Sequence, residues 1–361
     1  MDVKILTLSE WSQLLPDRGF EVFHTPEALR VLEEYSGSEL RLMGGFKGDQ
    51  VVALQPLFVT AGPLGAKMIS SPPPGHHVPH LGPILLHTSP KQSKYERVNR
   101  EFTSAVMDQV ESDDRTLWFM LCRPGYDDPR PYTWEGLSVD VSFTYHLDLA
   151  GATPEDVLMS FSRSRRREIR DGGDADIEIH REDIDSAAVI YRDTKARFEE
   201  QNVPFLLSWE YVRTLLDALD DRSRVYVARD STGTFLGGII TFISNDSISF
   251  SLGGARTTHD GLSVNTLIHW QIIRDVLTDP ALDSITTYDM VGAGEQRLSR
   301  YKSKFNPDHR PYYVIKSNGM KMWLAEKAYG GLSWIQASKE RVGTTINGNR
   351  EHVLGSLDPR V

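Results

Sequence analysis

The sequence has little of what several protein classes need. Among its 361 residues there is one cysteine, Cys122, so an intramolecular disulfide is impossible and a reducing compartment is expected. No apolar run approaches the roughly 20 residues that a membrane-spanning helix needs. The first residues carry charges where a secretory signal peptide has an apolar core. Together these absences predict a cytoplasmic protein.

The motifs of several enzyme classes are also missing. There is no GxxxxGK[ST] phosphate-binding loop and no GxSxG segment around a serine. Cys122 lies in the apolar run WFMLC, which is typical of a small buried residue and not of a reactive thiol. His76, His77 and His80 lack the spacing of a zinc motif, so we expect no metal site. Five prolines make the segment Ser70–Leu86 a stiff loop, either the rim of a substrate cleft or a simple connector.

The composition is that of an ordinary globular protein, with 40% hydrophobic and 25% charged residues. The formal net charge of -10 argues against a wholly basic surface for nucleic acid, although it leaves room for a local basic site. A chain of 361 residues is long for one hydrophobic core and comfortable for two domains.

One pattern of elements occurs twice along the chain. Glu39–Thr60 and Ser223–Ser244 each read as two apolar runs around a polar turn with glycine, which predicts an antiparallel hairpin. A helical pattern precedes each hairpin, and a second helical pattern and a strand follow it. These helices are expected at Pro26–Tyr35 and Lys94–Val110 in the first half and at Trp209–Leu219 and Asn265–Leu277 in the second. The repeat predicts two α/β (α+β) units, each with helices packed on a mixed sheet.

The boundary between the two units is expected near residue 150. The strand-like run SFTYHLDL is followed by Thr153, a good helix N-cap, by Pro154 at the first helical position and by Asp156, which completes a capping box. This helix should continue to Gly172 and Gly173, which would end it in a left-handed cap. The resulting division is a first domain at 1–150, a second at 151–330 and a polar tail at 331–361.

Arginines on this helix form the first candidate site. Helical spacing puts Arg163, Arg166 and Arg170 on one face, whereas Arg165 shares the apolar stripe. Guanidinium groups this close repel one another unless an anion lies among them, and their planar fork suits phosphate. The cluster therefore predicts a phosphate-bearing ligand, such as a tRNA end, a nucleotide-linked sugar or coenzyme A. The alternative is a solvated face paired with nearby acids such as Glu155.

The second candidate site lies in the segment 286–307. Asp289 ends a predicted strand and precedes a loop with Gly292, an arrangement that often presents an acid in a cleft. Tyr301 and Phe305 flank Lys302 and could anchor it so that it faces an anionic substrate or a developing oxyanion. The alternative is that the two rings are core anchors and the lysine is solvated.

The order of these motifs resembles the FemAB family of aminoacyltransferases, a branch of the GNAT superfamily. The matching segments are PHLGPILL, Tyr132-Thr133-Trp134, the strand Phe143–Leu149, the RxxIR pattern of Arg166, Ile169 and Arg170, and the run of Asp289, Gly292, Tyr301, Lys302 and Phe305. Two features depart from the pattern. The stretch ARTTHDGLSVNTLI lacks the glycine spacing of the superfamily's pyrophosphate loop, and Asn306 stands where a glycine is usual.

The resemblance implies two tandem GNAT-like domains, each with a mostly antiparallel sheet flanked by helices. It implies transfer of an aminoacyl or acyl group to a primary amine, with aminoacyl-tRNA or acyl-CoA as co-substrate, no tightly bound cofactor and an acceptor such as a cell-wall precursor. Lys302 would stabilise the transition state, and Asp289 would orient the amine or accept its proton. Arg163, Arg166 and Arg170 would bind phosphates, and Tyr301 and Phe305 would line the substrate site. The alternatives are an acyl-CoA-dependent N-acetyltransferase and a non-catalytic binder of RNA or another anionic ligand.

Overall fold

The computed structural model describes residues 1–62, 65–86, 89–255, 258–292, 294 and 296–318. The tail expected at 331–361 lies outside the described residues. No helix in this part of the chain has the length and apolar content to cross a bilayer.

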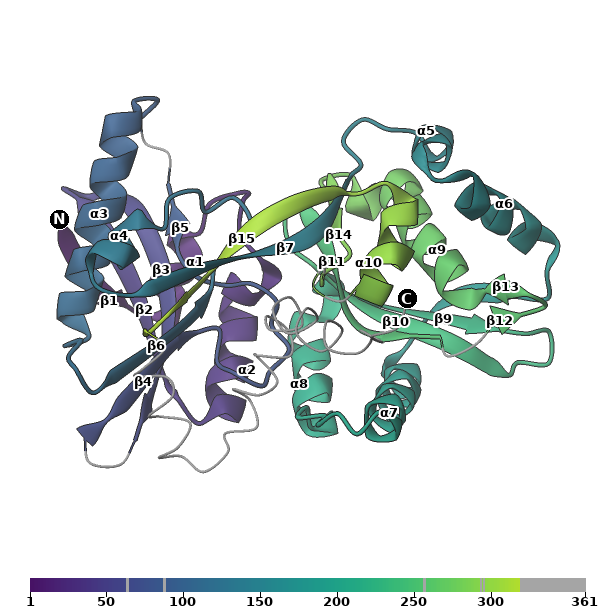
Figure 1. Cartoon of the computed structure of the whole chain (residues 1–361), viewed down its shortest axis with the longest axis horizontal. Coiled ribbons are helices and arrows are strands. Elements are labelled where there is room, and N and C mark those ends of the chain that lie inside the picture. Colours follow the sequence, from purple (N-terminus) through teal and green to yellow (C-terminus); the bar gives the residue numbers. More distant parts are fainter. Residues whose placement is uncertain (63–64, 87–88, 256–257, 293, 295, 319–361) are drawn as a thin grey trace, which may run out of the picture.

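A single mixed sheet runs through both halves of the molecule (Figure 1). Its strand order is β1-β2-β3-β4-β6-β15-β7-β14-β11-β10-β9-β8, and β5 pairs with β3. The β4–β6 and β11–β14 pairs are parallel, and the other pairs are antiparallel. The strands are β1 (Asp2–Leu6), β2 (Glu39–Lys47), β3 (Gln50–Ala61), β4 (Lys67–Ser71), β5 (Ile84–Leu85), β6 (Thr116–Leu121), β7 (Ser138–Asp148), β8 (Glu178–Glu182), β9 (Ser223–Arg229), β10 (Phe235–Ile243), β11 (Ser247–Gly254), β14 (Thr287–Asp289) and β15 (Asp308–Lys316), with β12 (Thr258–His259) and β13 (Leu262–Ser263) as a separate pair. The expected fold class and both predicted hairpins are confirmed.

Helices cover both faces of each half of the sheet (Figure 1). They are α1 (Leu8–Leu14), α2 (Pro26–Ser36), α3 (Gln92–Gln109), α4 (Arg130–Trp134), α5 (Pro154–Ser160), α6 (Arg163–Asp171), α7 (Ile184–Glu200), α8 (Trp209–Leu219), α9 (Val264–Thr278) and α10 (Gln296–Lys302). The four helices expected from the repeat are therefore present, with ends within two residues of the predicted ones.

Alternation along the strands explains why both faces are covered. In β9, Val225 and Val227 belong to a core with α7 and α8, whereas Tyr226 and Ala228 belong to a core with α9. The same alternation in β3 sends Leu54 toward α2 and Ala53 toward α3. Successive side chains of a strand point to opposite faces, so strands that are apolar at every position need a helical layer on each side.

β7 and β15 join the two halves. β15 is hydrogen-bonded to β6 of the first half along one edge and to β7 along the other, and β7 pairs in turn with β14 of the second half. β15 follows the last helix of the second half in the sequence, so the chain returns to complete the sheet of the first half.

The helix expected from Thr153 to Gly172 is two helices, and the single helix is a wrong prediction. The predicted cap is present, because Thr153 and Asp156 form a capping box in front of α5. The chain then leaves helical geometry at Phe161, and Ser162 caps α6 by accepting a hydrogen bond from the backbone of Arg165. Gly172 is also not left-handed, since it has φ -66° and continues into a short 3₁₀ turn. Serine at position 162 offers a second N-cap, and this local signal divides the helix.

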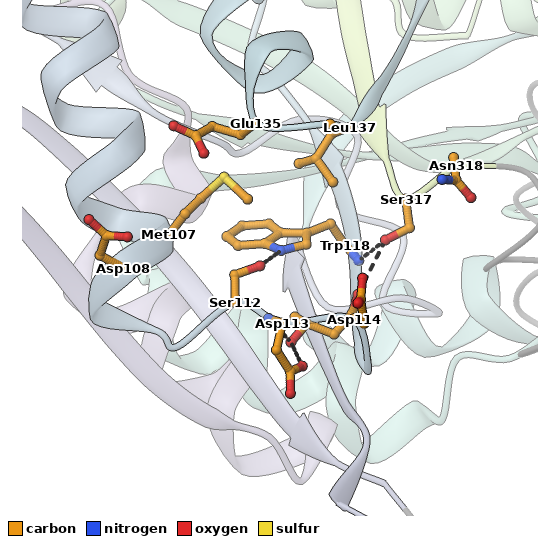
Figure 2. Close-up of a pocket in the computed structure, with 12 residues that line it drawn as sticks. Met107, Asp108, Ser112, Asp113, Asp114, Trp118, Glu135, Leu137, Ser317 and Asn318 are labelled. Atoms are coloured by element: carbon orange, nitrogen blue, oxygen red, sulfur yellow. Dashed lines mark hydrogen bonds between the residues drawn. The ribbon is translucent and has the colours of Figure 1, made fainter.

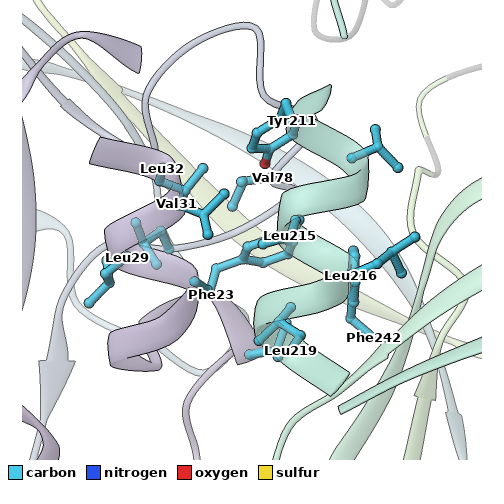
Figure 3. Close-up of a cluster of buried hydrophobic side chains, with 14 of the residues drawn as sticks. Phe23, Leu29, Val31, Leu32, Val78, Tyr211, Leu215, Leu216, Leu219 and Phe242 are labelled. Atoms are coloured by element: carbon cyan, nitrogen blue, oxygen red, sulfur yellow. The ribbon is translucent and has the colours of Figure 1, made fainter. Parts of the chain in front are cut away.

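The largest hydrophobic cluster spans the two halves (Figure 3). The face of α2 that carries Val31 and Tyr35 lies against α8. The Tyr35 and Thr214 hydroxyls meet at 2.8 Å, and Leu215 and Leu219 of α8 point toward α2. The ring of Phe23 meets that of Phe242 edge-on at 5.7 Å between centroids. This shared core fixes the position of one half relative to the other.

We expect Leu215→Ala to lower the free energy of unfolding by about 2–5 kcal/mol, because the side chain is 3% exposed and the change leaves a cavity in the shared core. Ile5→Ala on β1 is the matched control, since Ile5 is 52% exposed and its truncation should cost less than about 1 kcal/mol. Chemical denaturation of both variants measures the difference. Equal losses in the two would contradict a shared core at this position.

Each half also holds a buried histidine that ties elements together. His24 lies against the loop after β4, with its Nε2 3.2 Å from the carbonyl oxygen of Gly82, and Trp11 donates to the His24 carbonyl. His269 on α9 meets the Tyr288 hydroxyl of β14 at 2.7 Å through Nδ1. Burial lowers the pKa of each imidazole to about 3, and the positive charges of Lys302 and Arg165 lower that of His269 further. Both rings are therefore neutral in the folded protein at neutral pH.

These lowered pKa values predict acid sensitivity. Below about pH 6.5 the unfolded chain protonates both histidines and the folded chain does not, so the stability present above that pH is lost as the pH falls toward 3. Each histidine should add up to about 1.4 kcal/mol per pH unit to the slope of the free energy of unfolding against pH. Urea denaturation between pH 7 and pH 4 measures it. His269→Gln should remove one histidine's share of the slope, and an unchanged slope in that variant would contradict the prediction.

Candidate functional site

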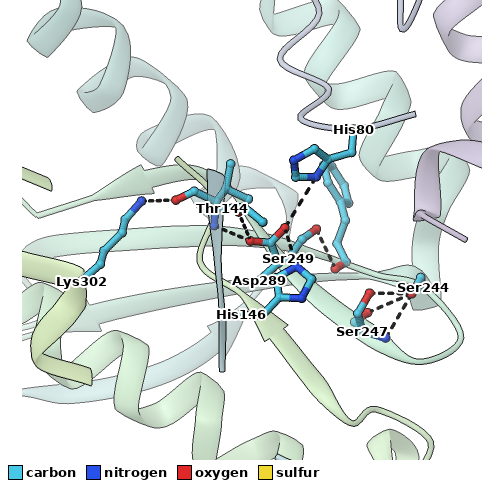
Figure 4. A network of polar contacts seen from close by, with 10 residues as sticks. His80, Thr144, His146, Ser244, Ser247, Ser249, Asp289 and Lys302 are labelled. Carbon is cyan, nitrogen blue, oxygen red and sulfur yellow. Dashed lines mark hydrogen bonds and ion pairs between the residues drawn. The ribbon is translucent and has the colours of Figure 1, made fainter. Parts of the chain in front are cut away.

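A buried carboxylate lies where the sheet passes from one half to the other (Figure 4). Asp289 ends β14 and is 4% exposed. Its Oδ1 accepts hydrogen bonds from the Thr144 hydroxyl at 2.6 Å and from the Val291 backbone at 2.8 Å. Its Oδ2 lies 3.5 Å from His146 Nε2 and 3.7 Å from His80 Nδ1. Asp289 thus has a polar partner on each side.

Three segments that are distant in the sequence build this group. Strand register places His146 of β7 opposite Asp289 of β14 on one side and opposite Asp308 of β15 on the other. His80 comes from the proline-rich loop after β4, which the end of β6 holds in place: Leu81 donates to the Leu121 carbonyl at 2.8 Å. The loop therefore does more than connect two strands, because it delivers a side chain to the buried carboxylate.

The charges of the group follow from burial and from these contacts. Burial alone would raise the pKa of Asp289, but the hydrogen bond from His146, the charges of the two imidazoles and the Thr144 hydroxyl outweigh it and hold the pKa below its usual value. Burial lowers the pKa of His80 to about 4, against the opposing pull of Asp289. The group at neutral pH is thus an ionised carboxylate beside a neutral His80.

His146 is the member of the group that a ligand can reach. Its side chain is 22% exposed, whereas those of His80 and Asp289 are 2% and 6% exposed. Because Nε2 faces Asp289, Nδ1 is left for another partner. An imidazole oriented by a buried carboxylate is a common arrangement for moving a proton to or from a substrate.

Lys302 lies at the same end of β14, on the far side of the loop that follows it. Its ammonium group donates to the carbonyl oxygen of Val291 and, at 3.1 Å, to that of Gly292. Phe305 is fully buried, Tyr301 packs against the same core, and the two rings lie 5.7 Å apart. The aromatic residues therefore anchor the segment and hold Lys302 against the loop behind Asp289. The turn after Phe305 keeps the geometry expected of it, with Asn306 left-handed at φ 54°.

The arginines of α6 separate into different environments. Arg166 donates to the carbonyl oxygens of Met159 and Phe161 and so closes the end of α5. Arg170 is exposed and lies 3.8 Å from Glu155. Arg163 is exposed on the first turn of the helix. The roles predicted for these arginines, and for Lys302, Asp289, Tyr301 and Phe305, stay predictions.

Arg165, which sequence spacing placed on the apolar stripe of the helix, is 3% exposed. It belongs to a second buried polar group, together with Glu168 and Thr266. It donates to Glu168 at 2.6 Å and to the Thr266 hydroxyl, and its guanidinium lies 4.5 Å from the centroid of the Phe305 ring. Glu168 in turn accepts from the Ser263 backbone at 2.9 Å and from the Thr266 hydroxyl at 3.1 Å. A carboxylate of the protein therefore lies at the N-terminus of α9.

A cavity lined by acidic side chains is remote from Asp289 (Figure 2). It has a volume of about 430 Å³ and is lined around Trp118 by four acidic side chains, Asp108, Asp113, Asp114 and Glu135, and by Ser317 and Asn318 beyond the end of β15. Asp308, at the other end of β15, is the residue beside His146, so the cavity is roughly 30 Å along the strand from the carboxylate group. Its acidic lining would repel an anionic ligand.

Sequence reasoning singled out Asp289 and did not identify its imidazole partners. His80 was considered only as a metal ligand, and His146 only as part of a strand. Among the residues described, no cluster of three or more His, Cys, Asp or Glu side chains could hold a metal ion. Cys122 is fully buried, and burial raises the pKa of its thiol, as expected of a structural residue. The signal for His146 lay in the pairing of β7 with β14, which is not visible in local patterns.

Comparison with known proteins bears on this arrangement. Residues 159–303 match the family model of the acetyltransferase (GNAT) domain. Among solved structures, the crystal structure of FemX has a TM-score of 0.66 at 11% identity, over 87% of this chain and 97% of that one. The C-terminal domain of a putative lysylphosphatidylglycerol synthetase from Agrobacterium fabrum has a TM-score of 0.54 at 11% identity, over 90% and 96%. A tandem GNAT protein from the clavulanic acid biosynthesis pathway has a TM-score of 0.50 at 12% identity, over 87% and 98%. No curated protein matches the sequence significantly.

The two-unit repeat, the shared sheet and the GNAT domain at 159–303 agree with one another and with the resemblance drawn from the motifs. The likeness to FemX extends over nearly the whole of that protein and establishes the fold. The chain therefore carries an acetyltransferase (GNAT) domain at residues 159–303 and has a FemAB-like GNAT fold.

Proposed function

We propose that this protein transfers an aminoacyl group from aminoacyl-tRNA to the primary amine of an acceptor. The amine nitrogen attacks the ester carbonyl carbon, a C–N bond forms, and the bond to the ribose oxygen of the tRNA breaks. The proton lost by the amine is taken up by a base, and the departing ribose oxygen gains a proton. The products are an amide and a free tRNA 3′ end.

The observation that carries the choice of donor is the carboxylate of Glu168 at the N-terminus of α9. A helix N-terminus favours anions, and the segment before α9 corresponds to the superfamily's pyrophosphate loop, whose glycine spacing this chain lacks. Glu168 already accepts from the Ser263 backbone and the Thr266 hydroxyl there. The diphosphate of coenzyme A would meet a negative charge in place of free donors. This supports a donor without a diphosphate at that position.

The exposed arginines of α6 fit an RNA donor. Arg163 and Arg170 are exposed on the helix, and the contacts of Arg170 with Glu155 and the Met159 sulfur, each 3.8 Å, lie at the surface. Both arginines can therefore approach a phosphate backbone. Arg166 closes the end of α5, so its loss would disturb the fold as well as any ligand. Arg163 and Arg170 are therefore the residues to change when testing RNA binding.

The group around Asp289 supplies the proton route. We assign His146 as the base that takes the proton from the attacking amine, because its ring is the most exposed of the group and Asp289 lies against its Nε2. Asp289 is the positioning residue, and its negative charge stabilises the imidazolium that forms. Lys302 adds a positive charge at the same end of β14, where it favours negative charge on the donor carbonyl oxygen.

Charged tRNA should raise the melting temperature of the purified protein, and acetyl-CoA should not. A ligand that binds only the folded state adds about 2.7 kcal/mol at one hundred times its dissociation constant, which a thermal-shift assay detects. The double variant Arg163→Gln/Arg170→Gln should lose most of the effect of tRNA, because the phosphates lose their partners.

A coenzyme A-dependent GNAT enzyme serves as the positive control for acetyl-CoA in the same plate. Stabilisation of the present protein by acetyl-CoA, with no effect of charged tRNA, would overturn the proposed donor and favour an acyl-CoA-dependent N-acyltransferase.

His146→Asn and Asp289→Asn should each lower kcat by about 10²–10⁴-fold, because general base catalysis is lost or misdirected. The matched control is His180→Asn, since His180 is an exposed histidine paired with Glu178 at 3.0 Å on the edge strand β8. Single-turnover transfer of a radiolabelled aminoacyl group to an amine acceptor measures the rates. Wild-type turnover in His146→Asn would rule out its assignment as the base.

A further inference from the structure

A second, smaller cavity lies in the first half and takes no part in the reaction described above. Its volume is about 220 Å³. It is lined by Pro16, Arg18 and Gly19 before the core residue Phe20, by the segment 83–86 around β5, by Tyr95 of α3, and by Arg123, Gly125 and Tyr126 after β6. The lining includes two arginines and no acidic side chain.

Arg123 is the central feature of this cavity. Its Nε is buried and has no hydrogen-bond partner among the described residues. Gly125 and Gly19 lie against the guanidinium group: a Cβ on Gly125 would come to 3.4 Å and one on Gly19 to 3.7 Å from its terminal nitrogens. A buried polar nitrogen without a hydrogen-bond partner is costly, and an anion bound at Arg123 would supply the partner that Nε lacks. Arg18 lines the same cavity from its exposed rim.

The cavity adjoins the group around Asp289. Arg123 follows the end of β6 and donates through its backbone to the Leu81 carbonyl at 3.1 Å, so it lies beside the residue that follows His80. The positive charge of Arg123 also contributes to the low pKa of His80 and opposes the rise in the pKa of Glu21 that burial causes. A ligand held at Arg123 would therefore lie on the His80 side of the Asp289 group.

We propose that Arg123, assisted by Arg18, binds a carboxylate or phosphate group of the amine acceptor and thereby brings the amine to His146. This inference rests on the proposed function, because it assigns the acceptor to the first half and the donor to α6 and α9 of the second. The volume of about 220 Å³ fits a small anionic group on a short stem and is too small for a whole nucleotide. The acceptor class is thus a primary amine with a carboxylate or a phosphate at one end.

Inorganic pyrophosphate and succinate are the probes, each titrated into the full chain by isothermal calorimetry at low salt. We expect at least one to bind, and we expect Arg123→Gln to weaken that binding at least tenfold and Arg18→Gln to weaken it less. Arg123→Lys, which keeps the charge, should retain part of the affinity. Arg213→Gln on α8 is the matched control, because Arg213 is exposed and does not line the cavity, and its loss removes the same charge.

Binding of pyrophosphate alone would indicate a phosphate-bearing acceptor, and binding of succinate alone a carboxylate-bearing one. Binding of neither probe, or equal binding in Arg123→Gln and Arg213→Gln, would overturn the inference. The thermal shift with charged tRNA is measured on the same variants. A normal thermal shift with tRNA in Arg123→Gln would show that this variant is folded and still binds the donor, so that its loss of probe binding concerns the acceptor site alone. If Arg123→Gln loses both the probe binding and the tRNA shift while Arg18→Gln keeps both, the inference is overturned.

Discussion

β15 lies between β6 and β7 and is hydrogen-bonded to both, and through these two pairings the sheets of the halves become one. The position of the candidate site depends on this seam. His146 stands opposite Asp289 on one neighbouring strand and opposite Asp308 on the other, so a shift of register by one residue would turn its side chain to the other face of the sheet. The core between α2 and α8 is a second connection between the two halves.

The seam tolerates a buried carboxylate because both of its oxygens have polar partners. The Thr144 hydroxyl, the Val291 backbone and the His146 ring offset part of the cost of removing the charge from water. The same contacts fix the carboxylate in one orientation. A polar group ordered in this way needs little rearrangement when a ligand binds beside it.

Much of the fold was predictable from the sequence because its signals are local. The hairpins, the four repeat helices and the cap at Thr153 follow from periodicity and turn chemistry within short windows. Asp289 was found because it ends a strand before a glycine loop. The features that the sequence did not predict depend on pairing between distant strands. Residues 308–316, for example, were assigned to the second unit, whereas in the structure they pair with β6 of the first. His80 and His146 approach Asp289 only through such pairings, and the break at Phe161 depends on a cap that competes with a continuous helical pattern.

The return of β15 to the first half also sets the order in which the protein can assemble during synthesis. Until residues 308–316 leave the ribosome, β6 is the last paired strand of its sheet and its outer edge has no partner, because its neighbour in the finished structure is β15. At ordinary rates of translation this interval lasts roughly 10–40 s. An open strand edge is a template for pairing with other chains, so the first half passes through a period of exposure to aggregation that ends only when the second half has been made. Nascent chains that stop before β15 should therefore be held by chaperones, whereas chains that extend past it should be released.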